Sequence, residues 1–240
     1  MIGNNNSLLQ WYREIPVVTR TYLTMAFVVT AACSLDILTP YRLYYSTRAV
    51  FKRHEYWRLI TNFLFFGKLG LDWLFHMFFM SRYARALEES SFHNRPADFL
   101  WMLVIGGTLL SCMAPFTRVD FLGPSLAFML VYVWARRNQY VTLQFMGLVH
   151  FTAPYLPWVL VGFAMALGHD PVYDLLGMAA GHIYYFLEDV YPAMFPHRTR
   201  PIQTPGVLCA LLGQSPRDNL PPLPPVTVVH GARILRATGG

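Results

Sequence analysis

The sequence predicts an all-α polytopic membrane protein, in which six transmembrane helices form a bundle that is followed by a polar tail. Hydrophobic residues make up 55% of the 240 residues and charged residues only 13%, whereas about a quarter of the residues of a soluble domain are charged. The apolar residues gather in six stretches that approach the roughly 20 residues needed to span a bilayer. An aromatic content of 16% fits this class, because Trp and Tyr collect at membrane–water interfaces.

Charge and cysteine content exclude several other classes of protein. The net charge is +6, but the basic residues fall in small groups between apolar runs and form no single stripe, so we expect no nucleic-acid partner. Cys33, Cys112 and Cys209 lie far apart in the sequence and predict neither a disulfide framework nor a metal site. No cofactor is expected.

The chain begins with a polar leader, residues 1–16, which we predict to be a cytosolic amphipathic segment. Its apolar side chains would face the lipid surface; these are Leu8, Leu9, Trp11 and Tyr12. The first apolar run starts near Val17 and ends before Asp36 and Pro40. It is therefore interpreted as a retained first span and not as a cleaved signal peptide.

Six spans are predicted, which together form a membrane domain over residues 17–192. They cover residues 20–38, 71–86, 97–116, 121–135, 143–167 and 172–190. The second and fourth are shorter than the hydrocarbon core requires. Short spans thin the local bilayer or lean on neighbouring helices.

An even number of spans places both termini on one side of the membrane, which we assign to the cytosol. Twelve of the 19 Lys and Arg residues then face the cytosol, in agreement with the positive-inside rule. The other seven are Arg42, Arg48, Lys52, Arg53, Arg58, Lys68 and Arg118. Six of these lie in the first loop, residues 39–70, which we predict to rest in the luminal interface with its basic side chains snorkelling to headgroups.

The character of the sequence changes after the sixth span. Prolines punctuate residues 193–240, where no sustained apolar period is present. This composition predicts a disordered, Pro-rich cytosolic tail.

Several blocks along the chain carry a family resemblance. They are IPVVTR at 15–20, EYWRLITNF at 55–63, SRY at 81–83, PAD at 96–98, YVW at 132–134, RRN at 136–138, YLPWV at 155–159 and GHIY at 181–184. Together they resemble the Derlin family of endoplasmic-reticulum membrane proteins, and the resemblance runs in order from about residue 8 to 195. Derlins are rhomboid-like pseudoproteases, so it implies a rhomboid-like six-helix bundle.

The resemblance also implies a function and partners. It predicts a multi-pass protein of the endoplasmic-reticulum membrane, with both termini cytosolic, that aids retrotranslocation of misfolded luminal and membrane proteins for ubiquitination and proteasomal degradation. The implied partners are these misfolded clients, a membrane ubiquitin-ligase complex, a cytosolic AAA ATPase and the lipid bilayer; homo- or hetero-oligomers stay open. Residues 230–236, HGARILR, are a degenerate version of the family's ATPase-binding motif, so direct recruitment through the tail is doubtful.

The catalytic pair of rhomboid proteases is incomplete in this chain. Those enzymes use a Ser in a Gly-x-Ser-Gly motif on the fourth span and a His on the sixth, which takes the proton of the serine hydroxyl. Here residues 123–126 read GPSL, which retains Ser125, but Asp174 stands where the His is expected. A carboxylate with a pKa near 3.9 is a weaker base than imidazole. We therefore predict a non-enzyme.

Other residues are assigned structural roles. Gly177 and Gly181 lie on one helix face and predict close packing against small residues of the fourth span, including Gly123. Trp57 and Arg58 are typical of an ordinary interfacial anchor. The resemblance to the Derlin family implies a second role, in which this pair stabilises the luminal loop.

Ionisable residues within predicted spans are candidates for function. These are Asp72, His76, His150, Asp174 and His182. His182 is the best candidate for a hydrogen bond between two helices.

Two alternative functions stay open at this point. An active intramembrane serine protease would use Ser125 as its nucleophile. A small-solute transporter or channel would suit a bundle with polar residues inside spans, although no convincing internal repeat of the kind that transporters carry is present.

Overall fold

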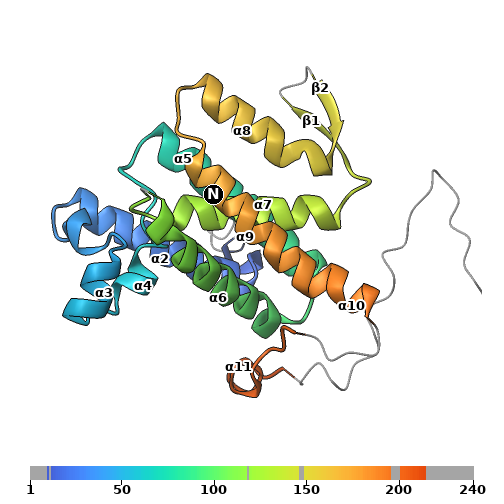
Figure 1. Cartoon of the computed structure of the whole chain (residues 1–240), viewed down its shortest axis with the longest axis horizontal. Helices are drawn as coiled ribbons and strands as arrows, with labels where there is room; N and C mark the ends of the chain where they lie inside the picture. The colour runs from blue at the N-terminus through green and yellow to red at the C-terminus, as the bar shows by residue number, and fades with distance from the viewer. Residues whose placement is uncertain (1–9, 11, 118, 146–148, 196–200, 215–240) are drawn as a thin grey trace, which may run out of the picture.

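The computed structural model describes residues 10, 12–117, 119–145, 149–195 and 201–214. Helices dominate it (Figure 1). The longer ones are α2 (Val17–Ser34), α5 (Leu71–Ser90), α6 (Pro96–Met113), α7 (Gly123–Arg137), α8 (Leu156–Ala166) and α9 (Val172–Tyr185). Shorter helices are α3 (Thr47–Arg53), α4 (Arg58–Thr61), α10 (Tyr191–Met194) and α11 (Gly206–Leu211), and a hairpin is formed by β1 (Thr142–Phe145) and β2 (Val149–Thr152).

The outer surface of the bundle is apolar, as the sequence predicts for a protein in lipid. Large hydrophobic side chains on α2, α5 and α8 are more than half exposed, among them Phe27, Val28, Leu74, Phe78 and Trp158. Contiguous apolar surface of this kind marks contact with a membrane or a partner. Two of the described helical segments, Val17–Ser34 and Pro96–Phe116, have the length and hydropathy of a membrane span.

Helix α7 is the centre of the bundle. It contacts α5, α6, α8 and α9, and most of its residues are buried on all sides, including Ser125, Met129 and Val133. Figure 1 shows α9 crossing in front of it, with α6 and α8 on opposite sides. We call the end of the bundle that carries residues 39–70 the loop end, and the opposite end, where α7 stops at Arg137, the tail end.

Helix α9 packs on α7 at van der Waals distance between backbones because it carries glycine at the contact. A Cβ atom at Gly177 would lie 2.4 Å from the carbonyl oxygen of Ser125 and 2.8 Å from the Cβ of Phe128. At Gly181 it would lie 2.9 Å from the ring of Tyr132. Neither position has room for a side chain.

Helix α2 is attached to α5 by a capping interaction between the two helices. Pro16 precedes α2 and supplies no side-chain cap. Glu88 of α5 accepts instead from the backbone N–H groups of Val18 (3.1 Å) and Thr19 (2.8 Å) and from the hydroxyl of Thr19 (2.6 Å). A carboxylate at a helix N-terminus satisfies free N–H groups and complements the helix dipole.

The structure corrects two of the predicted spans. The second helix is not short, because α5 has 20 residues and continues to Ser90. Residues 143–167 are not one span: the first part is the β-hairpin, which contains His150, and only the 11 residues of α8 are α-helical. The fourth helix, with 15 residues, is as short as predicted.

The predicted disordered tail is also shorter than expected. Helical structure continues from α9 through a π-helical segment (Phe186–Val190) and α10 to Met194. Residues 201–214 contain α11 and lie beside the start of α6 (Figure 1). The prediction of disorder from residue 193 onward is therefore wrong for residues 201–214, while residues 196–200 and 215–240 lie outside the described residues.

The leader is only partly described. Leu8, Leu9 and Trp11 lie outside the described residues, and residues 12–14 are helical. The Tyr12 hydroxyl shares a hydrogen bond of 2.7 Å with the Thr24 hydroxyl, which places the end of the leader against α2.

The α9–α7 contact gives a test of stability. We expect Gly177→Ala to lower the free energy of unfolding by about 1–3 kcal/mol, because the new methyl group overlaps backbone atoms that cannot move aside. Thermal unfolding of the purified protein in detergent measures the change.

Gly162→Ala is the matched control. Gly162 lies inside α8 with nothing within 4 Å of the new Cβ, so the alanine should leave stability unchanged or raise it by about 0.5–1 kcal/mol. Equal melting temperatures for the two variants would contradict the close-packing account.

Candidate functional site

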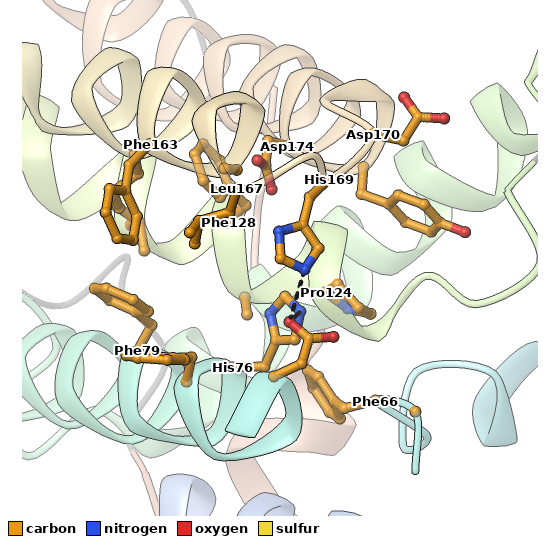
Figure 2. A pocket seen from close by; sticks show the side chains of 18 of the residues that line it. Phe66, His76, Phe79, Pro124, Phe128, Phe163, Leu167, His169, Asp170 and Asp174 are labelled. Carbon is orange, nitrogen blue, oxygen red and sulfur yellow. Dashed lines mark ion pairs between the residues drawn. The ribbon is translucent and has the colours of Figure 1, made fainter. Parts of the chain in front are cut away.

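An apolar groove lies between α5 and α8, with α7 as its floor. Its volume is about 350 Å³. Its apolar part is lined by Phe75 and Phe79 of α5, Ala127, Phe128 and Val131 of α7, and Leu160, Phe163 and Ala164 of α8. Figure 2 shows Phe79, Phe128 and Phe163 together at one end of the groove.

The other end of the groove, toward the loop end of the bundle, is polar. Asp72 Oδ1 lies 3.5 Å from His76 Nε2 and 3.6 Å from His169 Nε2. His169 belongs to the loop between α8 and α9, so this contact bridges that loop and α5 (Figure 2). Asp170 and Asp174 line the same end. Within the described ranges, no group of three or more His, Cys, Asp or Glu residues could hold a metal ion.

The two residues at the degenerate catalytic positions, Ser125 and Asp174, lie in different surroundings. Asp174, in the first turn of α9, lines the groove. Ser125 is fully buried in α7, and among the described residues its hydroxyl has no hydrogen-bond partner. The described residues therefore place no acid, base or imidazole in contact with the serine oxygen.

Gly123 was expected to pack with the α9 glycines, but it contacts a different segment. A Cβ atom there would lie 2.9 Å from the carbonyl oxygen of Phe63 and 3.2 Å from that of Phe65. Gly123 thus lets the start of α7 approach the backbone that follows α4. That backbone leads into Phe66 and Gly67, which close the groove at its polar end.

His182 makes a hydrogen bond between two helices. Its Nδ1 lies 2.7 Å from the hydroxyl of Tyr132 on α7, and the Tyr132 ring also packs on Gly181. His182 is exposed on α9 and does not line the groove. Its hydrogen bond joins the tail halves of α7 and α9.

Arg58 is the centre of the first loop. Its guanidinium is buried, donates to the carbonyl oxygens of Tyr41 (2.9 Å) and Tyr44 (3.1 Å), pairs with Glu55 and stacks over the Tyr44 ring at 4.9 Å. Trp57 beside it is 54% exposed, as suits an interfacial side chain. The planar fork of Arg58 ties the segments before α3 and at α4 together.

Sequence reasoning missed the bridge between Asp72 and His169, the cap that Glu88 provides, and the contacts of Asp98 with residues 204 and 214. Each joins residues about 70 to more than 100 positions apart. The one available signal was a charged residue inside or beside an apolar helix, which indicates a partner without naming it.

The Arg58 contacts predict the effect of a conservative change. Arg58→Lys keeps the charge but loses the planar group that donates from Nε to Glu55 and from Nη1 to the carbonyls of Tyr41 and Tyr44. We therefore expect the free energy of unfolding to fall by about 1–3 kcal/mol and residues 39–70 to be cleaved faster by protease. Arg48→Lys, at an exposed position of α3, is the control. Identical proteolysis of the two variants would show that the carbonyl contacts do not hold the loop.

Known proteins are similar to this chain over most of its length. The profile of the Der1-like family matches residues 15–206. The chain is 49% identical to Derlin-2.2 of Arabidopsis thaliana over 86% of this chain and 88% of that protein. It is 51% identical to Derlin-2.1 of Zea mays over 84% and 85%, and 37% identical to Derlin-1 of Oryza sativa subsp. japonica over 78% of each chain.

The family match extends from just before α2 to the first residue of α11, and it confirms the family predicted from the sequence blocks. The chain belongs to the Der1-like family, the family of the derlins.

Proposed function

We propose that this protein is a non-proteolytic component of endoplasmic-reticulum-associated degradation, which receives misfolded clients in the groove between α5 and α8 and aids their retrotranslocation. The observation that carries the proposal is an apolar groove of about 350 Å³ beside a serine whose hydroxyl has no partner among the described residues. The protein crosses the endoplasmic-reticulum membrane six times, with both termini in the cytosol and residues 39–70 on the luminal side. It works with a membrane ubiquitin-ligase complex and a cytosolic AAA ATPase.

The lining of the groove suits a polypeptide segment that is partly unfolded. Aromatic and aliphatic side chains of three helices line its length, and the carboxylates and imidazoles of Asp72, His76, His169 and Asp174 gather at its luminal end. Apolar client side chains gain free energy by burial there. Polar groups of the client backbone find partners at the polar end, which lowers the cost of entering the membrane.

Two of the three helices that border the groove, α7 and α8, are short. At about 1.5 Å per residue, the 15 residues of α7 and the 11 residues of α8 extend about 22 Å and 16 Å, against a hydrocarbon core of about 30 Å. A bilayer that adapts to these helices is thinned on this side of the bundle. Thinning shortens the apolar distance that a polar backbone must cross, where each unsatisfied peptide group costs several kcal/mol.

Two features of the retained serine argue against proteolysis. A serine nucleophile needs a general base within hydrogen-bond reach, and the Ser125 hydroxyl has none among the described residues. Its side chain is 0% exposed and lies under the α9 contact, where a peptide carbonyl could not approach. A fluorophosphonate probe should therefore fail to label the protein, and labelling that disappears in Ser125→Ala would favour the protease alternative.

Site-specific crosslinking tests the groove. A photoreactive residue at position 79 or 163 should crosslink to a misfolded client that is stalled by an inactive ATPase, because both positions line the groove. Position 158 is the control, since Trp158 lies on α8 with 60% of its surface exposed and does not line the groove. The adduct should contain the uncut client.

Two results would overturn this proposal. Equal adducts at positions 79, 163 and 158 would mean that the client contacts the outer surface and not the groove. Cleaved client in the adduct, lost in Ser125→Ala, would make the protein a protease.

Lengthening α8 tests the thinning mechanism. Four leucines inserted after Ala166 would extend α8 by about 6 Å and leave its packing on α7 in register. We expect client export to slow by about tenfold. A longer α8 lets the bilayer beside it return toward its full thickness, which lengthens the apolar distance that the client backbone must cross. Export is followed by pulse-chase of a luminal client.

The same four leucines inserted after Phe116 are the control, because the α6 segment Pro96–Phe116 already has the length of a full span. This variant should export at the normal rate. An unchanged rate in the α8 variant, with the protein correctly inserted, would contradict local thinning.

A further inference from the structure

The segment that follows the last span is held on the start of α6 through one buried carboxylate. The Thr204 hydroxyl donates to Asp98 Oδ1 at 2.6 Å, and the Gln214 amide donates to the same oxygen at 3.2 Å. The backbone N–H of Ala97 in turn donates to Gln214 Oε1 at 3.0 Å. Residues 201–214 are thus fastened at both ends of α11 to the first turn of α6.

Asp98 depends on these donors because it is almost completely buried. Only 3% of its surface is exposed, and its other oxygen pairs with Arg95 at 2.7 Å. A buried carboxylate is stable only when it is paired and hydrogen-bonded. The Thr204 hydroxyl therefore contributes a short, charge-assisted hydrogen bond that stabilises both the carboxylate and the docked segment.

Thr204 also stands in a local sequence that a protein kinase can recognise. It is followed by Pro205, and residues 202–205 have neither helix nor strand, with Pro205 itself at φ −58° and ψ 135°. This is the extended, polyproline-like backbone that a kinase groove accepts. Gln203 next to it is exposed, and Thr204 is partly exposed.

We propose that Thr204 is a phosphorylation site for a proline-directed protein kinase, and that its modification releases residues 201–214 from α6. In the reaction, Thr204 Oγ forms a bond to the γ-phosphorus of a nucleoside triphosphate, the bond to the diphosphate leaving group breaks, and the hydroxyl proton passes to a base of the kinase. The product has no proton to donate to Asp98. It carries close to two negative charges against that carboxylate, which disrupts the contact by like-charge repulsion.

Residues 201–214, which we call the docked segment, contain a thiol whose accessibility reports their release. Cys209 of α11 is 2% exposed, so its thiol is protected while the segment is docked and becomes accessible on release. Release also frees the point from which the chain continues to residues 215–240. The proposal relies on the cytosolic placement of this end of the bundle under the proposed function, but the labelling experiment in detergent does not, so the two can fail separately.

The first test uses full-length protein in detergent with Cys33→Ser and Cys112→Ser, which leaves Cys209 as the single thiol. Thr204→Glu should raise the rate of maleimide labelling of Cys209 by about tenfold or more over the parent. Gln203→Glu places the same charge one residue away, where the described contacts include none with Asp98, and should label at the parent rate. Thr204→Glu labelling at the parent rate, or Gln203→Glu labelling as fast as Thr204→Glu, would overturn the proposal.

The second test adds the modification itself. A purified proline-directed kinase with ATP should place one phosphate on Thr204, detected by mass spectrometry, and the phosphorylated fraction should show the fast Cys209 labelling. Gln214→Ala weakens docking without touching Thr204 or Arg95, so it should be phosphorylated faster than the parent. Absence of phosphate on Thr204 in both proteins would overturn the site, and a phosphorylated protein with Cys209 still protected would overturn the release.

Discussion

The contact between Gly177 of α9 and the backbone of α7 is the constraint on which the rest of the structure depends. Only a residue without a side chain fits where a Cβ would lie 2.4 Å from the Ser125 carbonyl. This close approach fixes where α9 begins along α7, and therefore where Asp174 lies at the groove. The same contact covers Ser125, which is fully buried and does not line the groove.

Other contacts hold the helices and loops together at the two ends of the bundle. At the loop end, Arg58 binds two carbonyls of the first loop, and Gly123 brings the start of α7 against the backbone of Phe63. At the tail end, Arg137 of α7 binds Asp189 of the π-helical segment with two hydrogen bonds at 2.9 and 3.1 Å. The start of α7 is therefore held against the first loop, and its end is held against the segment that continues α9.

Hydropathy predicts a helix correctly where the apolar run ends at the same residue as the helix. It fails where the helix continues past the run or where the run contains another structure. α5 continues past its apolar run because Glu88 is needed to cap α2, and hydropathy cannot register a partner 70 positions away. Hydropathy predicts a span from residue 143 because this stretch is largely apolar, whereas the structure forms strands β1 and β2 there. Its register pairs Leu143 with Phe151 and Gln144 with His150, an alternation of period two that total hydropathy conceals.

Only part of the candidate site could be predicted from the sequence. The glycine pair and its partner helix could be predicted from spacing, whereas the interpretation of Asp174 depends on the resemblance to rhomboid proteases. The groove itself could not, because it is the space left between α5, α7 and α8, and no short segment of sequence encodes it. The prolines of the tail predict disorder by composition, but hydrogen bonds of Thr204 and Gln214 to the start of α6 hold residues 201–214 in the fold.

The contact with α9 defines what position 125 requires of its residue. An unpaired buried hydroxyl costs about 1–3 kcal/mol, so the polar group is not retained for stability. What α9 requires at this point is a small side chain whose backbone carbonyl can face Gly177, and serine, alanine and glycine all satisfy that requirement. The approach of α9 therefore constrains the size of the residue at position 125 whether or not its hydroxyl has a chemical role.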